Sequence, residues 1–514
     1  MIHGLSLLLC ACQIVGSYSL RDVEAELGSM LAPTRIIDGS YPLSRLELWS
    51  NATHILTSVG GARGSPAAAW MLLGMVVIIM SMFYLVNSPS SSIRDVTWRT
   101  LSGTLSIFCS VLIFHSIKEM DRSCWRYATF FYYDESVWLD DRFFFDLISY
   151  GRLVAYYFVF QFVLLKLKER PHGLHGWGHI GEHIGGFMAA DIFSNMQEEE
   201  PWNRNLISDA QVVVIAVAAL SLLMSLGRRM RSVILDAQQI VELDEDGNEV
   251  ESVKNWKHQC YHAEENILSF ALGLTFTQLC RFYLVGKVPH AHGIQQTDDP
   301  RHIWSIFCFA GACLLIMVVA DIAKRLFFQR FSHYFSTISG IMAMTMAWSL
   351  FYGGKWLFWH ATAGEGLLHS GKDVMIAFMV QAVLFSIVST SAIIGCDCML
   401  RITPFFTCLL EQTTESLVLL IGLSWEAAFQ HAIFLAVHAE GGGSDLEEYL
   451  STIAVSFSLC GLVIPAWILY IVPRAMHHHA HEKRTTEKGE LDHEDKKSNE
   501  THEAAAVHGN GSHG

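Results

Sequence analysis

Charged residues are scarce in this chain. Asp, Glu, Lys and Arg make up 17% of its 514 residues, against about 25% in soluble proteins. Proline is also rare, with 11 residues, while hydrophobic residues reach 51%. The apolar residues gather in runs of about 18 to 25, the length that crosses a bilayer as a helix. The composition argues against an ordinary soluble protein and predicts an all-α, polytopic integral membrane helical bundle.

Nucleotide-binding and nucleic-acid-binding signatures are missing as well. The chain has no Walker, dinucleotide, kinase, haem-attachment or nucleophile-elbow motif, which argues against a nucleotide-driven pump and a membrane-anchored form of a familiar soluble enzyme. No stretch interleaves basic and aromatic residues, and the formal net charge of -15 lies mostly in loops and the tail. We therefore expect the lipid bilayer as a partner, and neither nucleic acid nor enzymatic activity.

Apolar runs predict about eleven transmembrane helices within residues 67–472. The expected helices lie at 67–87, 100–117, 143–166, 177–196, 207–227, 262–286, 303–323, 333–352, 373–395, 410–437 and 449–472. The segment 177–196 is the most polar of these, so it either crosses the membrane inside the bundle or re-enters on the same side.

The two ends of the chain carry no such helices. Residues 1–19 combine an apolar run with small residues, which predicts a signal peptide. Residues 20–66 follow as an extracellular or lumenal segment whose Asn51 begins a glycosylation sequon. From 473 to 514 the chain is rich in His, Glu and Lys without apolar periodicity, which predicts a disordered tail.

The distribution of charge between loops predicts the orientation, because Lys and Arg concentrate in cytoplasmic loops. With the mature N-terminus outside, basic clusters such as 228–231 and 324–325 lie in inner loops, and acidic clusters such as 198–200 lie in outer ones. We therefore expect a cytoplasmic loop at 228–257, a cytoplasmic C-terminus, and residence in the plasma membrane or another membrane of the secretory pathway.

A polar outline recurs in five of the expected helices. It starts at a carboxylate or hydroxyl residue, continues through a short run to glycine, and leads to further hydroxyl or acidic groups. The starting positions 100, 182, 265, 337 and 415 are separated by 82, 83, 72 and 78 residues. This spacing predicts parallel two-helix internal repeats. Because polar groups are costly in lipid, the five outlined helices should face inward and the others outward.

Carboxylates at matching depth are the first candidates for a transport path. A carboxylate within a membrane bundle can carry or gate a cation or proton. The expected path is lined by Glu265, Glu415, Glu426, Thr275, Ser424, Glu182 and Asp191. A structural alternative applies to Glu264 and Glu265, since a carboxylate in the first turn of a helix simply complements the helix dipole.

A second candidate is a metal site, with zinc as the cofactor. His179 and His183 share one helical face beside Glu182. His179-Ile180-Gly181-Glu182-His183 resembles the H-x-x-E-H motif of inverzincin proteases, but over five residues alone, and we interpret that match as chance. The paired histidines also resemble the H-x-x-x-H helix of ZIP-type zinc transporters, although Ile184 stands where that family has an acid. The alternative is a set of interfacial histidines before the helix.

The sequence thus favours a membrane transport protein, channel or secondary transporter, for a small cation or protons. Two alternatives stay open: a non-transporting multi-pass scaffold or receptor-like protein, and a zinc transporter or metal-dependent membrane enzyme centred on His179 and His183. The transported species and the oligomeric state are not set by these patterns.

Overall fold

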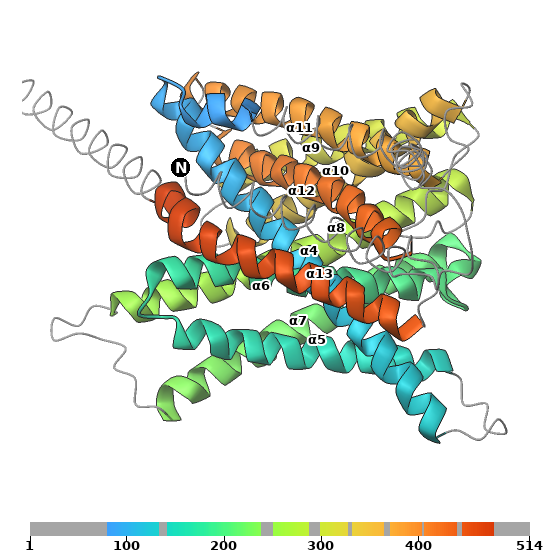
Figure 1. Cartoon of the computed structure of the whole chain (residues 1–514). Coiled ribbons are helices and arrows are strands. Elements are labelled where there is room, and N and C mark those ends of the chain that lie inside the picture. The colour runs from blue at the N-terminus through green and yellow to red at the C-terminus, as the bar shows by residue number, and fades with distance from the viewer. Residues whose placement is uncertain are drawn as a thin grey trace, which may run out of the picture. The chain divides into compact units, whose positions relative to one another are not determined.

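Long helices make up the computed structural model, and its described part contains no strand (Figure 1). The structure describes residues 80–132, 141–237, 250–286, 299–326, 332–363, 371–402, 406–438 and 445–476. The predicted signal peptide, Asn51, most of the segment 67–87 and the tail after 476 lie outside these ranges.

Residues 80–86 are helical, and ten longer α-helices follow them in the described part of the chain, with a short 3-10 helix and a π-helical turn. They are α4 (Ser91–Tyr132), α5 (Asp141–Lys166), α6 (Pro171–Glu198), η1 (Trp202–Arg204), α7 (Leu206–Ala237), α8 (Glu251–Val285), α9 (Pro300–Leu326), α10 (Ser332–Ala363), α11 (Gly371–Ile402), α12 (Thr407–His438), α13 (Asp445–Ala466) and η4 (Trp467–Ile471).

The inner ring consists of α4, α6, α8, α10 and α12. Each of these helices packs against the next, and α12 packs back against α4. Between neighbours, Ser110 Oγ donates to Ile180 O at 2.9 Å, and Thr277 Oγ1 donates to Thr345 O at 3.3 Å. These are the five helices in which the polar outline recurs, and the most polar of them, α6, is continuous within the ring.

The outer layer consists of α5, α7, α9, α11 and α13. Each outer helix packs mainly against the inner helix that follows it in the chain, and α13 packs against α4. In Figure 1, α11 and α9 lie along the top and α5 and α7 along the bottom, with inner-ring helices between them. The two-layer arrangement predicted from polarity is therefore the one observed.

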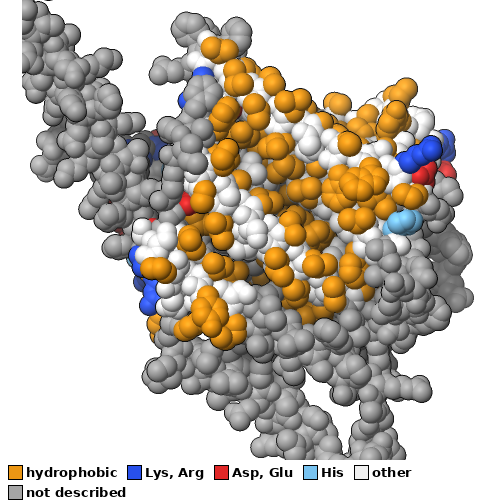
Figure 2. Space-filling model, turned by 90° about the horizontal axis from the view of Figure 1, so that it is seen from above, with side chains coloured by type: hydrophobic (Ala, Val, Ile, Leu, Met, Phe, Trp, Pro, Cys, Tyr) orange, Lys and Arg blue, Asp and Glu red, His pale blue; other side chains and the backbone are white. Residues whose placement is uncertain are grey.

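Lipid-compatible surface belongs mainly to the outer layer. Among the described residues, seven helices are long and apolar enough to cross a membrane: α4, α5, α7, α8, α9, α11 and α13. The outer spans are 22% to 44% buried, whereas those of α4 and α8 are 56% and 67% buried. Figure 2 shows one face with broad hydrophobic coverage and charged side chains at its edges. The chain is a multi-pass membrane protein.

Helix ends differ from the sequence prediction. Around the predicted loop 228–257 the helices extend further than expected, because α7 continues to Ala237 and α8 begins at Glu251. Glu264 and Glu265 consequently lie more than three turns inside α8, so the first-turn dipole explanation does not apply to them. The helix after Pro473 also continues to Met476, into the predicted tail.

Glycines permit close approach within the ring. A Cβ on Gly273 of α8 would lie 2.7 Å from Met344 Cβ of α10, and one on Gly422 of α12 would lie 2.6 Å from Ile107 Cγ2 of α4. Helices can approach this closely only where a small residue faces the neighbour. Gly286 has a different role: it is the C-terminal cap of α8 and has a left-handed backbone conformation, with φ of 76°.

Candidate functional site

The His–Glu cluster comprises His179, Glu182, His183 and His262. Glu182 is buried in the inner ring, 1% exposed. Its Oε1 lies 2.6 Å from Nδ1 of His179, and its Oε2 lies 3.1 Å from Nδ1 of His262. Because an ionised carboxylate only accepts, each imidazole donates its Nδ1–H. One carboxylate thus joins histidines of α6 and α8.

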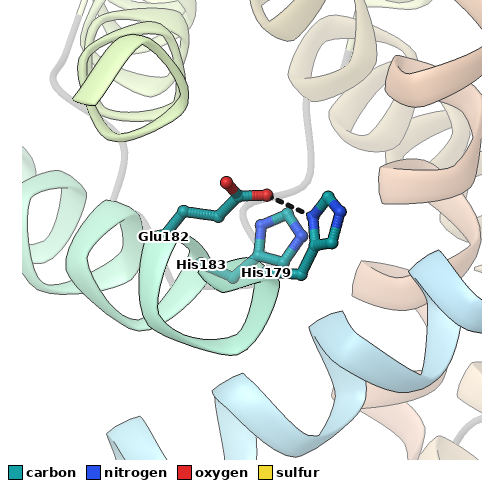
Figure 3. Close-up of side chains that lie close together, drawn as sticks. All are labelled: His179, Glu182 and His183. Carbon is teal, nitrogen blue, oxygen red and sulfur yellow. Dashed lines mark hydrogen bonds and ion pairs between the residues drawn. The ribbon is translucent and has the colours of Figure 1, made fainter. Parts of the chain in front are cut away.

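Three of these side chains are also grouped as metal ligands would be. One ligand atom from each of His179, Glu182 and His183 lies within 4.8 Å of the others, and Figure 3 shows all three projecting from one helix. The α-helix creates this grouping, because residues three and four positions apart share a face. The set of two imidazoles and a carboxylate is chemically suited to Zn²⁺.

A small cavity of about 40 Å³ lies beside the cluster, between α8, α10 and α12. Glu265 and Glu415 both line it, and Thr337 Oγ1 donates to Glu265 Oε1 at 3.3 Å. Asn266 also lines it, and its Nδ2 lies 3.3 Å from His262 Nδ1. Two predicted path residues therefore meet in one polar pocket next to the His–Glu cluster.

The aromatic layer crosses the ring at the next level. It comprises Phe114 of α4, Phe187 of α6, Phe270 of α8 and Trp348 of α10, with successive ring centroids 5.9, 4.6 and 5.5 Å apart. All four side chains are buried. On α6, α8 and α10 these rings lie between the polar residues of the His–Glu cluster and small cavity and residues of a second, larger cavity.

The large cavity, of about 290 Å³, lies on the other side of the layer and is lined by all five inner helices and Phe378 of α11. Lys118 Nζ donates to Asp191 Oδ1 at 2.6 Å, and His115 Nε2 lies 3.0 Å from Glu426 Oε1. Asp191 and Glu426 thus face this cavity, each with a partner from α4. The separation of Glu182 and Asp191 along α6 is nine residues, or about 14 Å of helix.

The inner helices run parallel through these levels. On α8, α10 and α12, residues lining the small cavity precede in sequence those lining the large one: 265 before 274, 337 before 355 and 415 before 426. Phe187 follows Glu182 and precedes Asp191 on α6 in the same sense. This direction is the one that the predicted two-helix units require.

Two predicted path residues occupy other surroundings. Thr275 Oγ1 donates to Leu272 O at 3.0 Å, and Ser424 Oγ donates to Ile421 O at 2.8 Å. Both are buried, and neither lines the small or the large cavity. Their hydroxyl groups bond within their own helices, which suits helix packing more than ion binding.

Several residues of this interior are not predicted as site residues from the sequence. His262 carries one detectable signal, since His258 precedes it by one turn on the same face. His115, Lys118 and Lys355 have no such local spacing, because their partners come from helices distant in sequence. Arg281 is another such residue: it is 0% exposed, with its guanidinium 3.8 Å from the Tyr352 ring centroid.

Comparison with known proteins gives no relative. No family model matches the chain, and no curated protein or solved structure is significantly similar to it. The functional argument accordingly depends on the geometry described above.

Proposed function

We propose that this chain is a membrane transport protein that moves protons through the interior of its inner ring. The observation that carries the proposal is the pairing of histidine with carboxylate on both sides of the aromatic layer: His179 and His262 with Glu182 on one side, and His115 with Glu426 on the other. Imidazole and carboxylate groups can exchange protons near neutral pH, and intramembrane chains of them are typical of proton relays.

The proposed path begins in the small cavity at Glu265 and Glu415, continues through the His–Glu cluster, and reaches Asp191 and Glu426 in the large cavity. We place the small cavity on the cytoplasmic side, following the distribution of Lys and Arg between loops. The aromatic layer would have to rearrange or hydrate for protons to cross, which is the behaviour of a gated path. The regular packing of inner and outer helices supports five two-helix repeats as the framework.

Proton flux into proteoliposomes tests this function, with an internal pH dye and the membrane potential clamped. Glu182→Gln should lower the flux at least about tenfold, since a positioned acid–base group typically speeds proton transfer by about a hundredfold or more. The matched control is Glu200→Gln, because Glu200 is exposed and pairs with Arg204 at 2.9 Å; its loss should change little.

Unchanged flux in folded Glu182→Gln protein would reject the path. Wild-type protein without flux would favour the scaffold role, in which the polar residues only join helices.

A second candidate is the binding or transport of a divalent metal such as zinc, and the grouping of His179, Glu182 and His183 specifically favours it. Equilibrium dialysis of the purified protein against zinc measures this directly. Saturable zinc binding that is lost in His183→Asn would support the metal role, while absence of zinc binding in folded wild type would leave the cluster to protons.

A further inference from the structure

The walls of the large cavity are unusually aromatic for a path that serves protons alone. Phe114, Phe187, Trp348, Phe351 and Phe378 all line it. A proton relay needs water or a chain of polar groups, whereas these surfaces favour an apolar body. The volume of about 290 Å³ also approaches the lower end of the range for small-molecule sites, about 300 Å³.

The charged side chains that line this cavity differ in whether an oppositely charged partner lies beside them. Its two carboxylates, Asp191 and Glu426, each have a basic partner, Lys118 and His115. Lys355 also lines the cavity and is 8% exposed. In the described part of the chain, no carboxylate lies within ion-pair distance of its ammonium, which instead lies over the rings of Phe351 and Phe378, 4.8 and 5.6 Å from their centroids.

A second residue of α10, Trp348, also lines this cavity. Trp348 is 6% exposed, and its indole Nε1–H has no acceptor among the described residues. Trp348 and Lys355 lie two turns apart on α10, and a long helical side chain points back toward the preceding turns. The position of the Lys355 ammonium over Phe351, one turn earlier, fits that direction. An unsatisfied buried donor is costly unless a ligand supplies the acceptor.

We propose that the large cavity binds a small organic anion with an apolar body, a monocarboxylate, through Lys355 and Trp348. The carboxylate accepts from the Lys355 ammonium and the Trp348 N–H, and the apolar body contacts the phenylalanine rings. This inference rests on the proposed transport function, because it names the substrate class that would travel together with the proton. A bare inorganic anion would leave most of the cavity and its aromatic walls without contact.

Binding of radiolabelled benzoate to the purified full-length protein in detergent tests the site without any gradient or flux. Wild type should bind benzoate saturably, and excess unlabelled benzoate should displace the label. Benzamide, which has the same shape without the charge, should not displace it at equal concentration. Chloride at equal concentration should not displace it either.

Three variants sharpen the test. Lys355→Met keeps the side-chain length and should weaken binding about a hundredfold, as loss of a buried charge partner does. Trp348→Phe removes the indole donor and should weaken binding about tenfold. The matched control is Lys166→Met, because Lys166 is exposed and its ammonium also lies over a phenylalanine, 5.2 Å from the ring centroid of Phe162; it should bind as wild type does.

Several results would overturn the inference: no saturable benzoate binding by folded wild type, equal binding by Lys355→Met and Trp348→Phe, displacement by benzamide, or displacement by chloride. The readout separates this inference from the proposed function. If proton flux depends on Glu182 but the protein binds no benzoate, the proposed proton path is supported and the organic-anion site is rejected. If the protein binds benzoate but shows no proton flux, the organic-anion site is supported and its coupling to proton transport is rejected.

Discussion

Glu264 and Glu265 are neighbours in sequence, yet they face different parts of the molecule. Glu264 points away from the ring interior, where its Oε1 accepts from Tyr157 of α5 and Arg231 of α7, both at 2.5 Å. Glu265 faces the small cavity and accepts from Thr337. One residue along a helix changes the direction by about 100°. The first carboxylate is fixed by a permanent cation; the second is surrounded by groups compatible with proton exchange.

The largest effect is expected at the fixed carboxylate. Glu264→Gln leaves the Arg231 guanidinium, 4% exposed, without its counter-charge, and breaking a buried ion pair costs about 3–5 kcal/mol. We expect a clear loss of thermal stability in detergent, measured by the unfolding temperature. The double variant Glu264→Gln with Arg231→Met should regain part of the loss, because it removes the stranded charge. A single variant as stable as wild type would contradict a structural ion pair.

The next effect concerns the close contact between α8 and α10 within the ring. Gly273→Ala places a methyl group 2.7 Å from Met344 Cβ and 2.9 Å from its backbone carbon, so α8 and α10 must separate. Overpacking of this kind costs about 1–3 kcal/mol. Gly311→Ala on α9 is the matched control, since nothing lies within 4 Å of the added carbon; it should stabilise by about 0.5–1 kcal/mol through helix propensity. Equal unfolding temperatures for the two variants would contradict the close packing.

Sequence alone predicts the layers well and the connections poorly. The inward direction of α6 and α8 follows from the cost of polar groups in lipid, and that cost can be read residue by residue. The end of α7 cannot be read this way. Positive charge predicts that Arg231 lies in a loop, but it lies within α7, where its guanidinium pairs with Glu264, 33 residues later. Long-range partners override local composition at such positions.

The candidate site shows the same division. Glu182, His179 and His183 are predictable because they share one turn of one helix, and Glu265 and Glu415 because they occupy equivalent positions in the repeated outline. Lys355 and Trp348 become candidate binding residues only through their neighbours in the folded structure. Trp348 belongs to the predicted apolar segment 333–352 and Lys355 lies just beyond it; only the packing of α10, α11 and α12 brings both residues to one cavity with Phe378 and Glu426.

The smallest change in stability is expected at Glu265. Glu265→Gln keeps an oxygen that can accept from Thr337, and the side chain is only partly buried, so the unfolding free energy should change by no more than about 0.5 kcal/mol. Proton flux should nevertheless fall, because an amide cannot exchange a proton, and the double variant with Glu415→Gln should lower it further. Glu264→Gln and Glu265→Gln therefore predict opposite profiles: an unstable protein in the first case, and a stable protein with reduced flux in the second. Flux equal to wild type in Glu265→Gln and in the double variant would leave the small cavity outside the path and place the proton entry at the His–Glu cluster itself.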